Sequence, residues 1–331
     1  MKKRMLIAAV SLAALAACTK NEQPSVDAEK KTVELEVSVP SYETKADSGE
    51  SAVSDCQILV YSLETGMLEA HARTTGIGSP VKIQCTVGQK EVVVLGNAPD
   101  MSSMVKLTDL KSARSYLSHN AIGSLVMEGS KIVRLTSSSS ETISIKRVVS
   151  KIRLKSIVTR FEQGGYNDLD FKLKSVYLIN VPADKMYLSS PSLSLGVLPA
   201  TWYCKDEYSG DVGGCDSFLY HDLEGKILVP SVEYQVGKTF YCCPNPYSAE
   251  SYADPWEPRP TRLVVEAYIG TQLCCYPISL PELKQNAVYD VSLEVTRPGK
   301  DEPSSDMEKY GEMFNVTVLD WDSGGSLNEV L

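Results

Sequence analysis

The sequence predicts a mainly β protein made of two tandem β-sandwich-like domains, with one short helix in the first domain. Segments in which apolar and polar residues alternate recur along most of the chain, and this period of two is typical of strands with one buried face. Clusters of Gly, Asn, Asp and Pro separate these segments and predict turns. The 331 residues, 43% of them hydrophobic, are enough for two packed domains and differ from a disordered composition.

The chain begins with a pattern typical of a secretory signal. A basic start at residues 1–4 precedes an apolar run over residues 5–17, which is shorter than the ~20 residues that a membrane-spanning helix needs. The run ends in Leu-Ala-Ala-Cys, which resembles the bacterial lipobox. We therefore expect residues 1–17 to be a lipoprotein signal peptide, with cleavage between Ala17 and Cys18 and a lipid attached to the Cys18 thiol. The alternative is an ordinary secretion site with a chance cysteine.

A polar tether and a first strand follow the signal. Residues 18–31 contain few apolar side chains and are predicted to be a flexible tether. In residues 32–39 four apolar side chains alternate with polar ones, which predicts a strand with one buried face. The polar stretch after Pro40 carries one basic residue, Lys45, and we expect it to be an exposed, protease-sensitive loop. The apolar residues of the first strand are Val33, Leu35, Val37 and Val39.

The centre of the chain contains the predicted helix and the predicted domain boundary. Leu107, Leu110, Ala113 and Leu117 recur at helical spacing, with Thr108 as a candidate N-cap. A long apolar-alternating segment over residues 142–160 is expected to break near residue 149, where we place the boundary. The N-terminal domain then covers residues 32–149 and the C-terminal domain residues 150–331. Farther along, the sequence Ile269-Gly270-Thr271 predicts a hairpin turn.

Eight cysteines remain once Cys18 is assigned to the lipobox. An exported protein with an even number of cysteines is expected to form disulfides, although spacing does not reveal their pairing. Adjacent cysteines in a strand point to opposite faces, so each adjacent pair could supply one thiol that bridges elsewhere. Zinc is disfavoured, because the chain has neither Cys-x-x-Cys knuckles nor suitably spaced histidines. The candidate disulfide cysteines are Cys204, Cys215, Cys242, Cys243, Cys274 and Cys275.

Charge and motifs argue against nucleic-acid binding and against catalysis. The net charge is −9, and no basic stripe with interleaved aromatic residues occurs. The chain lacks a Gly-x-Ser-x-Gly elbow, a Walker loop and a His-Glu-x-x-His motif, so we predict no enzyme, no cofactor and no metal. An acidic loop at residues 206–216 could hold a cation or be merely solvated. Trp202 and Trp256 could stack on a sugar or plug the end of a sandwich.

Several short motifs in a fixed order resemble the fimbrillin superfamily of Bacteroidales, the lipoprotein precursors of type V pili. These are the lipobox with Cys18, the first strand with its Thr-Lys loop, and four later segments. The resemblance implies two transthyretin-like β-sandwiches. The later segments are Cys56-Gln-Ile-Leu-Val-Tyr61, Val92-Val-Val-Leu-Gly-Asn-Ala98, Lys146-Arg-Val-Val-Ser-Lys-Ile152 and Val316-Thr-Val-Leu-Asp-Trp321.

The resemblance also implies a mechanism of assembly. A trypsin-like surface protease would cut between Lys45 and Ala46, although family members cut by arginine-specific proteases carry Arg there. The first strand would then leave, and a strand from the next subunit would take its place. The donor would be the C-terminal segment, whose alternative role is an ordinary last strand of its own domain. The candidate donor residues are Phe314, Val316, Val318 and Trp321, followed by a Gly-rich hinge at residues 322–326.

The resemblance therefore implies a structural or accessory fimbrial subunit of the cell outer membrane and the fimbrium, supporting adhesion. Its implied partners are other fimbrial subunits, the outer membrane through lipid on Cys18, a surface protease, and a host or bacterial receptor. The cysteines and long loops of the second half favour a minor, tip or accessory subunit over a shaft subunit. The alternative function is a surface glycan-binding lipoprotein that does not polymerise.

Overall fold

The computed structural model describes residues 31–40, 49–162, 165–189, 197–210, 212–251, 253–304, 313–321 and 326–330. The chain from Thr32 to Leu331 forms one compact unit. Four residues of the predicted processing sites, Ala17, Cys18, Lys45 and Ala46, lie outside the described residues. Among the helices that are described, none has the length and apolarity needed to cross a membrane.

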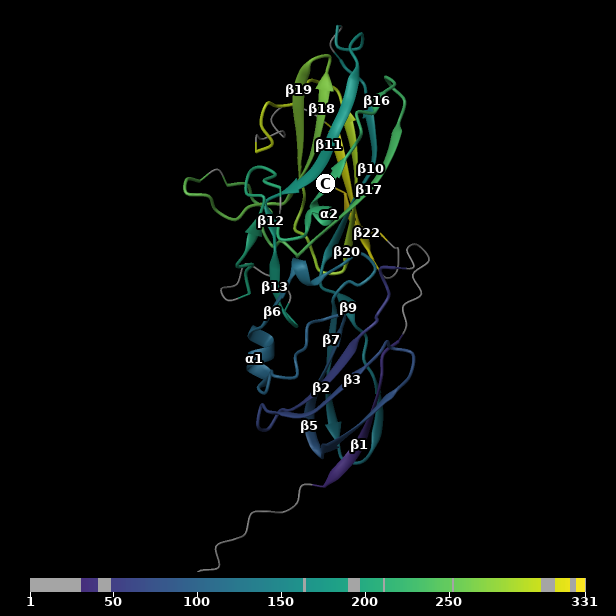
Figure 1. Cartoon of the computed structure of the whole chain (residues 1–331), viewed down its shortest axis with the longest axis vertical. Coiled ribbons are helices and arrows are strands. Elements are labelled where there is room, and N and C mark those ends of the chain that lie inside the picture. The colour runs from purple at the N-terminus through teal and green to yellow at the C-terminus, as the bar shows by residue number, and fades with distance from the viewer. Residues whose placement is uncertain are drawn as a thin grey trace, which may run out of the picture. The chain divides into compact units, whose positions relative to one another are not determined.

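Strands dominate the structure, which confirms the predicted mainly β class (Figure 1). The strands before residue 150 are β1 (Thr32–Ser38), β2 (Cys56–Ser62), β3 (Leu68–Thr74), β4 (Val81–Thr86), β5 (Gly88–Gly96), β6 (Arg114–Tyr116), β7 (Met127–Leu135), β8 (Ser139–Thr142) and β9 (Lys146–Arg147). The later strands are β10 (Ser150–Thr159), β11 (Phe171–Ile179), β12 (Val181–Pro182), β13 (Asp184–Met186), β14 (Trp202–Tyr203), β15 (Tyr220–Asp222), β16 (Ile227–Leu228), β17 (Tyr234–Cys242), β18 (Arg262–Ile269), β19 (Gln272–Ser279), β20 (Ala287–Val295), β21 (Met313–Asp320) and β22 (Ser326–Val330). The helices are α1 (Leu107–Ser112), the 3-10 helix η1 (Leu117–His119) and α2 (Asp216–Leu219).

The N-terminal strands form two packed sheets. A five-stranded sheet, β3-β2-β5-β7-β9, faces a three-stranded sheet, β4-β1-β8. The core between them contains Leu35 of β1 and Ile83 of β4 from one sheet, and Ile58 of β2 and Val94 of β5 from the other. Strand β2 alternates as its sequence predicts, because its even-numbered apolar residues enter this core while Leu59 enters a second core on the opposite face.

Helix α1 covers that second face of the five-stranded sheet. Leu107 and Leu110 are buried in the same cluster as Leu59 of β2. The predicted helix is confirmed but ends earlier, because Leu117 belongs to the separate helix η1. The predicted N-cap at Thr108 is wrong. The helix already begins at Leu107, so Thr108 lies inside its first turn, and the N-cap residue is Lys106, which makes no side-chain capping bond.

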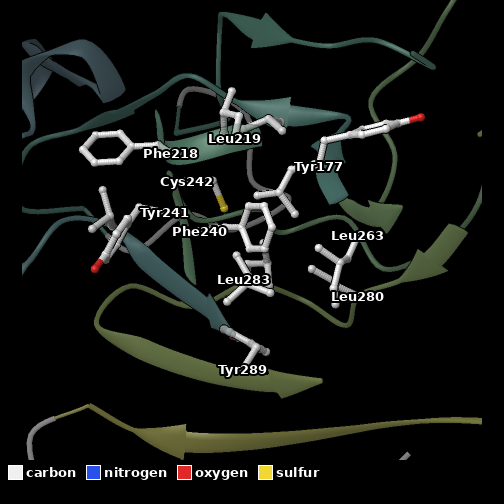
Figure 2. Close-up of a cluster of buried hydrophobic side chains, with 14 of the residues drawn as sticks. Tyr177, Phe218, Leu219, Phe240, Tyr241, Cys242, Leu263, Leu280, Leu283 and Tyr289 are labelled. Carbon is white, nitrogen blue, oxygen red and sulfur yellow. The ribbon is translucent and has the colours of Figure 1, made fainter. Parts of the chain in front are cut away.

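The strands after residue 150 form a second pair of sheets. One has the order β17-β10-β20-β21-β22, and the other has the order β15-β11-β18-β19, with β16 also paired to β11. Figure 2 shows part of their shared core, in which Phe240 of β17 lies among side chains from α2, β18 and β20. Strands β18 and β19 form the predicted hairpin, and Gly270 adopts the left-handed φ of 60° that its turn requires.

The two halves of the compact unit are joined by pairing and by buried charge. The expected strand break is confirmed, since β9 ends at Arg147 and β10 begins at Ser150. The domain boundary that we placed there remains a prediction. Strand β6 of the first half pairs with β13 of the second. Beside this pair the ammonium of Lys185 contacts the carboxylate of Glu128 on β7, and both residues are buried.

The structure corrects the expectation of disulfides, since all eight cysteines among the described residues are free and buried. In the β18–β19 ladder Cys274 and Cys275 lie opposite Ala267 and Glu266, so neither faces another cysteine. Both members of each adjacent pair are buried, because both faces of their strands are covered. Burial raises the pKa of Cys275 to about 12, which keeps its thiol protonated at neutral pH. The correction applies to Cys204, Cys215, Cys242, Cys243, Cys274 and Cys275.

The position of Leu35 yields a test of the fold. Leu35 is completely buried at the centre of β1, so Leu35→Ala should lower the free energy of unfolding by about 2–5 kcal/mol. Urea denaturation followed by circular dichroism measures this change. Glu36→Ala, on the outer face of the same strand, is the matched control and should change stability by less than about 0.5 kcal/mol. Equal effects of the two substitutions would contradict the assigned inner face.

Candidate functional site

The candidate site is the slot that β1 fills between β4 and β8. β1 pairs antiparallel with β4, where Val33 lies opposite Cys85, and parallel with β8, where Leu35 lies opposite Ser139. Strands β4 and β8 pair with no other strand among the described residues. β1 is therefore the strand through which this sheet is held together. We call its place, bounded by β4, β8 and the core beneath, the first-strand slot.

The inner face of β1 is buried as the alternation predicts. Val33, Leu35, Val37 and Val39 are 5%, 0%, 1% and 8% exposed, and all four belong to the core between the two N-terminal sheets. A chain that fills the slot must therefore supply apolar side chains at every second position. The placement agrees with a strand that completes a sandwich. Its expulsion during maturation stays a prediction.

Polar groups on the outer face of β1 contact both neighbouring strands. The Glu34 carboxylate accepts a hydrogen bond from Lys82 Nζ of β4 at 2.9 Å, and this bond raises the pKa of Lys82. On the other side the hydroxyl of Ser140 donates to Glu36 at 3.4 Å. Lys82 and Glu34 are well exposed, with side-chain exposures of 63% and 38%, so solvent weakens the ion pair. The buried face, and not these charges, holds β1 in place.

The wall of the slot includes residues of β4 that were not predicted from the sequence as site residues. Ile83 and Cys85 of β4 lie opposite Leu35 and Val33 and are 5% and 4% exposed. Their burial could be predicted, because Val81, Ile83 and Cys85 alternate with polar residues. Alternation alone does not indicate that this strand is the neighbour of β1. Burial in the core raises the pKa of the Cys85 thiol.

The candidate donor residues lie within a sheet of their own half. β21 pairs with β20 on one side and β22 on the other, and β22 is the edge strand. Val316, Val318 and Trp321 are buried, and Phe314 is half-buried against the same core. The structure thus places β21 as a strand of its own sandwich. Its donation to another subunit stays a prediction that requires it to leave this position.

The tryptophans and the acidic loop are occupied by protein contacts. Trp202 and Trp256 pack edge to face with ring centroids 5.4 Å apart, and Lys205 lies over the Trp256 ring at 4.7 Å. This arrangement agrees with packing of the loops against each other. In the acidic loop Arg259 donates to Asp206 at 3.2 Å. Among the described residues no group of three or more His, Cys, Asp or Glu side chains is placed to hold a metal ion.

Comparison with known proteins identifies the fold. No protein-family model matches the chain, and no curated protein matches its sequence. A fimbrilin of Porphyromonas gingivalis superposes with a TM-score of 0.63 at 16% identity, over 86% of this chain and 96% of that protein. The chain has the fimbrillin fold.

Two further structures with this fold come from the same bacterial order. A candidate cell adhesion protein of Bacteroides eggerthii matches with a TM-score of 0.66 at 17% identity, over 88% of this chain and 96% of that one. The tip fimbrial protein of Porphyromonas gingivalis, solved with a C-terminal truncation, matches with a TM-score of 0.54 at 14% identity, over 88% and 100% of the two chains. The resemblance to fimbrillins is thereby confirmed for the fold.

Cys85 provides a reporter for the first-strand slot. While β1 is in place, Cys85 lies beside Val33 and is 4% exposed, so it should react slowly with a maleimide, since burial hinders both access and ionisation. Cutting the chain at a protease site inserted within residues 41–48 should let β1 leave and speed the labelling by about ten-fold or more. Peptide mapping by mass spectrometry measures the rate at each cysteine.

Two controls separate opening of the slot from general unfolding. Cys274 is 0% exposed in β19 and should stay unlabelled before and after the cut. An excess of a peptide with the sequence of residues 32–40 should refill the slot and protect Cys85 again. Labelling of Cys85 that is unchanged by the cut would show that β1 does not leave, and parallel labelling of Cys274 would show unfolding.

Proposed function

We propose that the chain is a structural or accessory subunit of a fimbria, made as a lipoprotein precursor and assembled by strand exchange. The observation that carries this proposal is the position of β1 between two strands that have no other described strand partner. Loss of β1 would uncover backbone groups on β4 and β8 together with an apolar floor, which is the kind of surface that an added strand satisfies. The shared fimbrillin fold supports the same function.

In this proposal the precursor is modified at one site and cut at another. Lipid on Cys18 anchors the precursor in the outer membrane, since several acyl chains give stable attachment. A surface protease cuts between Lys45 and Ala46, in the segment that joins β1 to Glu50. The mature subunit then belongs to the fimbrium at the cell surface. No catalytic step is assigned to the chain itself, whose function in this proposal is structural and adhesive.

The donor in this proposal is the C-terminal segment of a second subunit. Phe314, Val316 and Val318 alternate with polar residues, as do the four apolar residues of β1. A strand with this pattern buries one face in the first-strand slot and exposes the other. Each subunit then fills its neighbour's slot, a head-to-tail contact that does not close and therefore extends into a fibre.

Maturation cleavage is tested by trypsin treatment of the folded precursor. We use a Cys18→Ser variant, which removes the lipid acceptor and keeps the protein in solution. N-terminal sequencing should identify a stable product that begins at Ala46, because proteolysis concentrates in exposed polar loops. The product should be absent from Lys45→Ala treated in the same way. A precursor that keeps residues 32–40 covalently attached after extended digestion would contradict cleavage at this site.

Strand donation is tested with a peptide, because deleting β21 would also remove Val316 and Val318 from the core of its own sheet. A labelled peptide of residues 313–321 should bind the trypsin-processed protein and should not bind the uncut Lys45→Ala variant. Fluorescence anisotropy measures the binding. The same peptide with Val316→Asp and Val318→Asp is the control, since a charge on the buried face prevents insertion. Equal binding of both peptides, or no binding of either, would overturn the assignment of the donor.

A further inference from the structure

A buried network connects Glu50 with the end of β21. Glu50 lies two residues beyond the segment 41–48 and is buried against the second half of the compact unit. Its carboxylate lies 2.7 Å from the ammonium of Lys151 on β10. It also accepts hydrogen bonds from the hydroxyl of Tyr241 on β17 and, at 3.1 Å, from the indole nitrogen of Trp321. One side chain from the start of the sequence thus contacts three separate parts of the C-terminal half.

Trp321, at the end of β21, is held on several sides within this network. The guanidinium of Arg147 lies 4.6 Å from the centroid of its ring, and the Tyr241 ring stacks on it at 6.1 Å with an interplanar angle of 23°. The backbone nitrogen of Trp321 donates to the carbonyl of Asn286 at 3.4 Å. Arg147 also donates to the backbone carbonyl of Glu50 at 2.9 Å. The same residues therefore fix both Glu50 and the end of β21.

The charges explain why Glu50 governs this network. Lys151 is buried, and its ion pair with Glu50 offsets part of the cost of burying its charge. The cation–π contacts of Trp321 with Arg147 and with Lys151, at 4.6 and 5.5 Å, depend on where those cations are held. Removing the Glu50 charge takes this ion pair from Lys151 and leaves the Trp321 indole a neutral, weaker acceptor. The effect should therefore reach β21 first, because Trp321 is its anchor at this end.

We propose that Glu50 is a latch that retains β21 in its own sheet through Trp321. The proposed donor strand is thereby held in its own sheet in the intact precursor. It stays held after a cut that follows Lys45, because Glu50 lies C-terminal to that cut and remains in the mature chain. The purpose of the latch rests on the proposed function, whereas the retention of β21 is a property of the single chain. The latch is thus measured on a monomer without any assembly.

Hydrogen–deuterium exchange of the Cys18→Ser precursor tests the latch. Glu50→Gln keeps the size of the side chain and removes its charge. We expect exchange of the β21 amides, residues 314–320, to accelerate by about ten-fold or more, because the strand opens locally more often. Exchange in β18 (Arg262–Ile269), which belongs to the facing sheet, should stay within about two-fold of the parent protein. Trp321→Phe keeps an aromatic ring but loses the donor to Glu50, and it should accelerate β21 less than Glu50→Gln.

A second charge removal, far from β21, serves as the control. Glu34→Gln removes an equivalent charge from the exposed pair with Lys82 and should leave β21 unchanged. Unchanged β21 exchange in a folded Glu50→Gln protein would overturn the latch. Equal acceleration of β21 and β18 would also overturn it, since Glu50 would then stabilise the whole unit. Neither result depends on binding of the donor peptide to the slot. The exchange experiment therefore tests the latch separately from the peptide-binding test of strand exchange.

Discussion

The structure depends on one pairing, that of β1 with β4 on one side and β8 on the other. Neither outer strand has another strand partner among the described residues, so this layer of the sandwich exists only while a strand occupies the first-strand slot. Burying one Val or Leu side chain contributes about 1.5–3 kcal/mol. β1 buries four of them, which is comparable with the about 5–15 kcal/mol of net stability typical of a domain. A stable subunit therefore needs its slot filled.

The slot selects its occupant by direction as well as by hydrophobicity. β1 runs antiparallel to β4 and parallel to β8, so an entering strand keeps both ladders only if it runs in the direction of β1. A shift of one residue would turn its apolar side chains toward solvent. Direction and phase together fix how a second chain can approach. In the proposed assembly, such a slot would make the fibre polar without any specific contact from the exposed Glu34–Lys82 pair.

Local alternation predicted the strands well and their partners poorly. The period-two pattern identified β1 and its buried face, and likewise Val316 and Val318 of β21. Consecutive side chains of a strand point to opposite faces, so the buried face can be read from neighbouring residues. It did not reveal that β8 lies parallel to β1, since that pairing joins segments about a hundred residues apart, from Leu35 to Ser139. The disulfide expectation failed for a related reason. Alternation places neighbouring cysteines on opposite faces, but only the tertiary structure shows that both faces are covered.

In the proposed strand exchange, the contacts that β21 loses in its own sheet are balanced against those it gains in the slot of another subunit. At home β21 is paired on both sides and buries Val316 and Val318, so its departure from an intact precursor sacrifices these contacts while every slot is already occupied by β1. Under this proposal, the departing strand would recover two ladders and an apolar floor in a neighbouring subunit that has lost its β1. In the proposed scheme, occupation of the slot by β1 and the contact between Glu50 and Trp321 would oppose premature release of β21 in different ways. An occupied slot would leave β21 no site to enter, and the Glu50–Trp321 contact would raise the free-energy barrier to its leaving its own sheet.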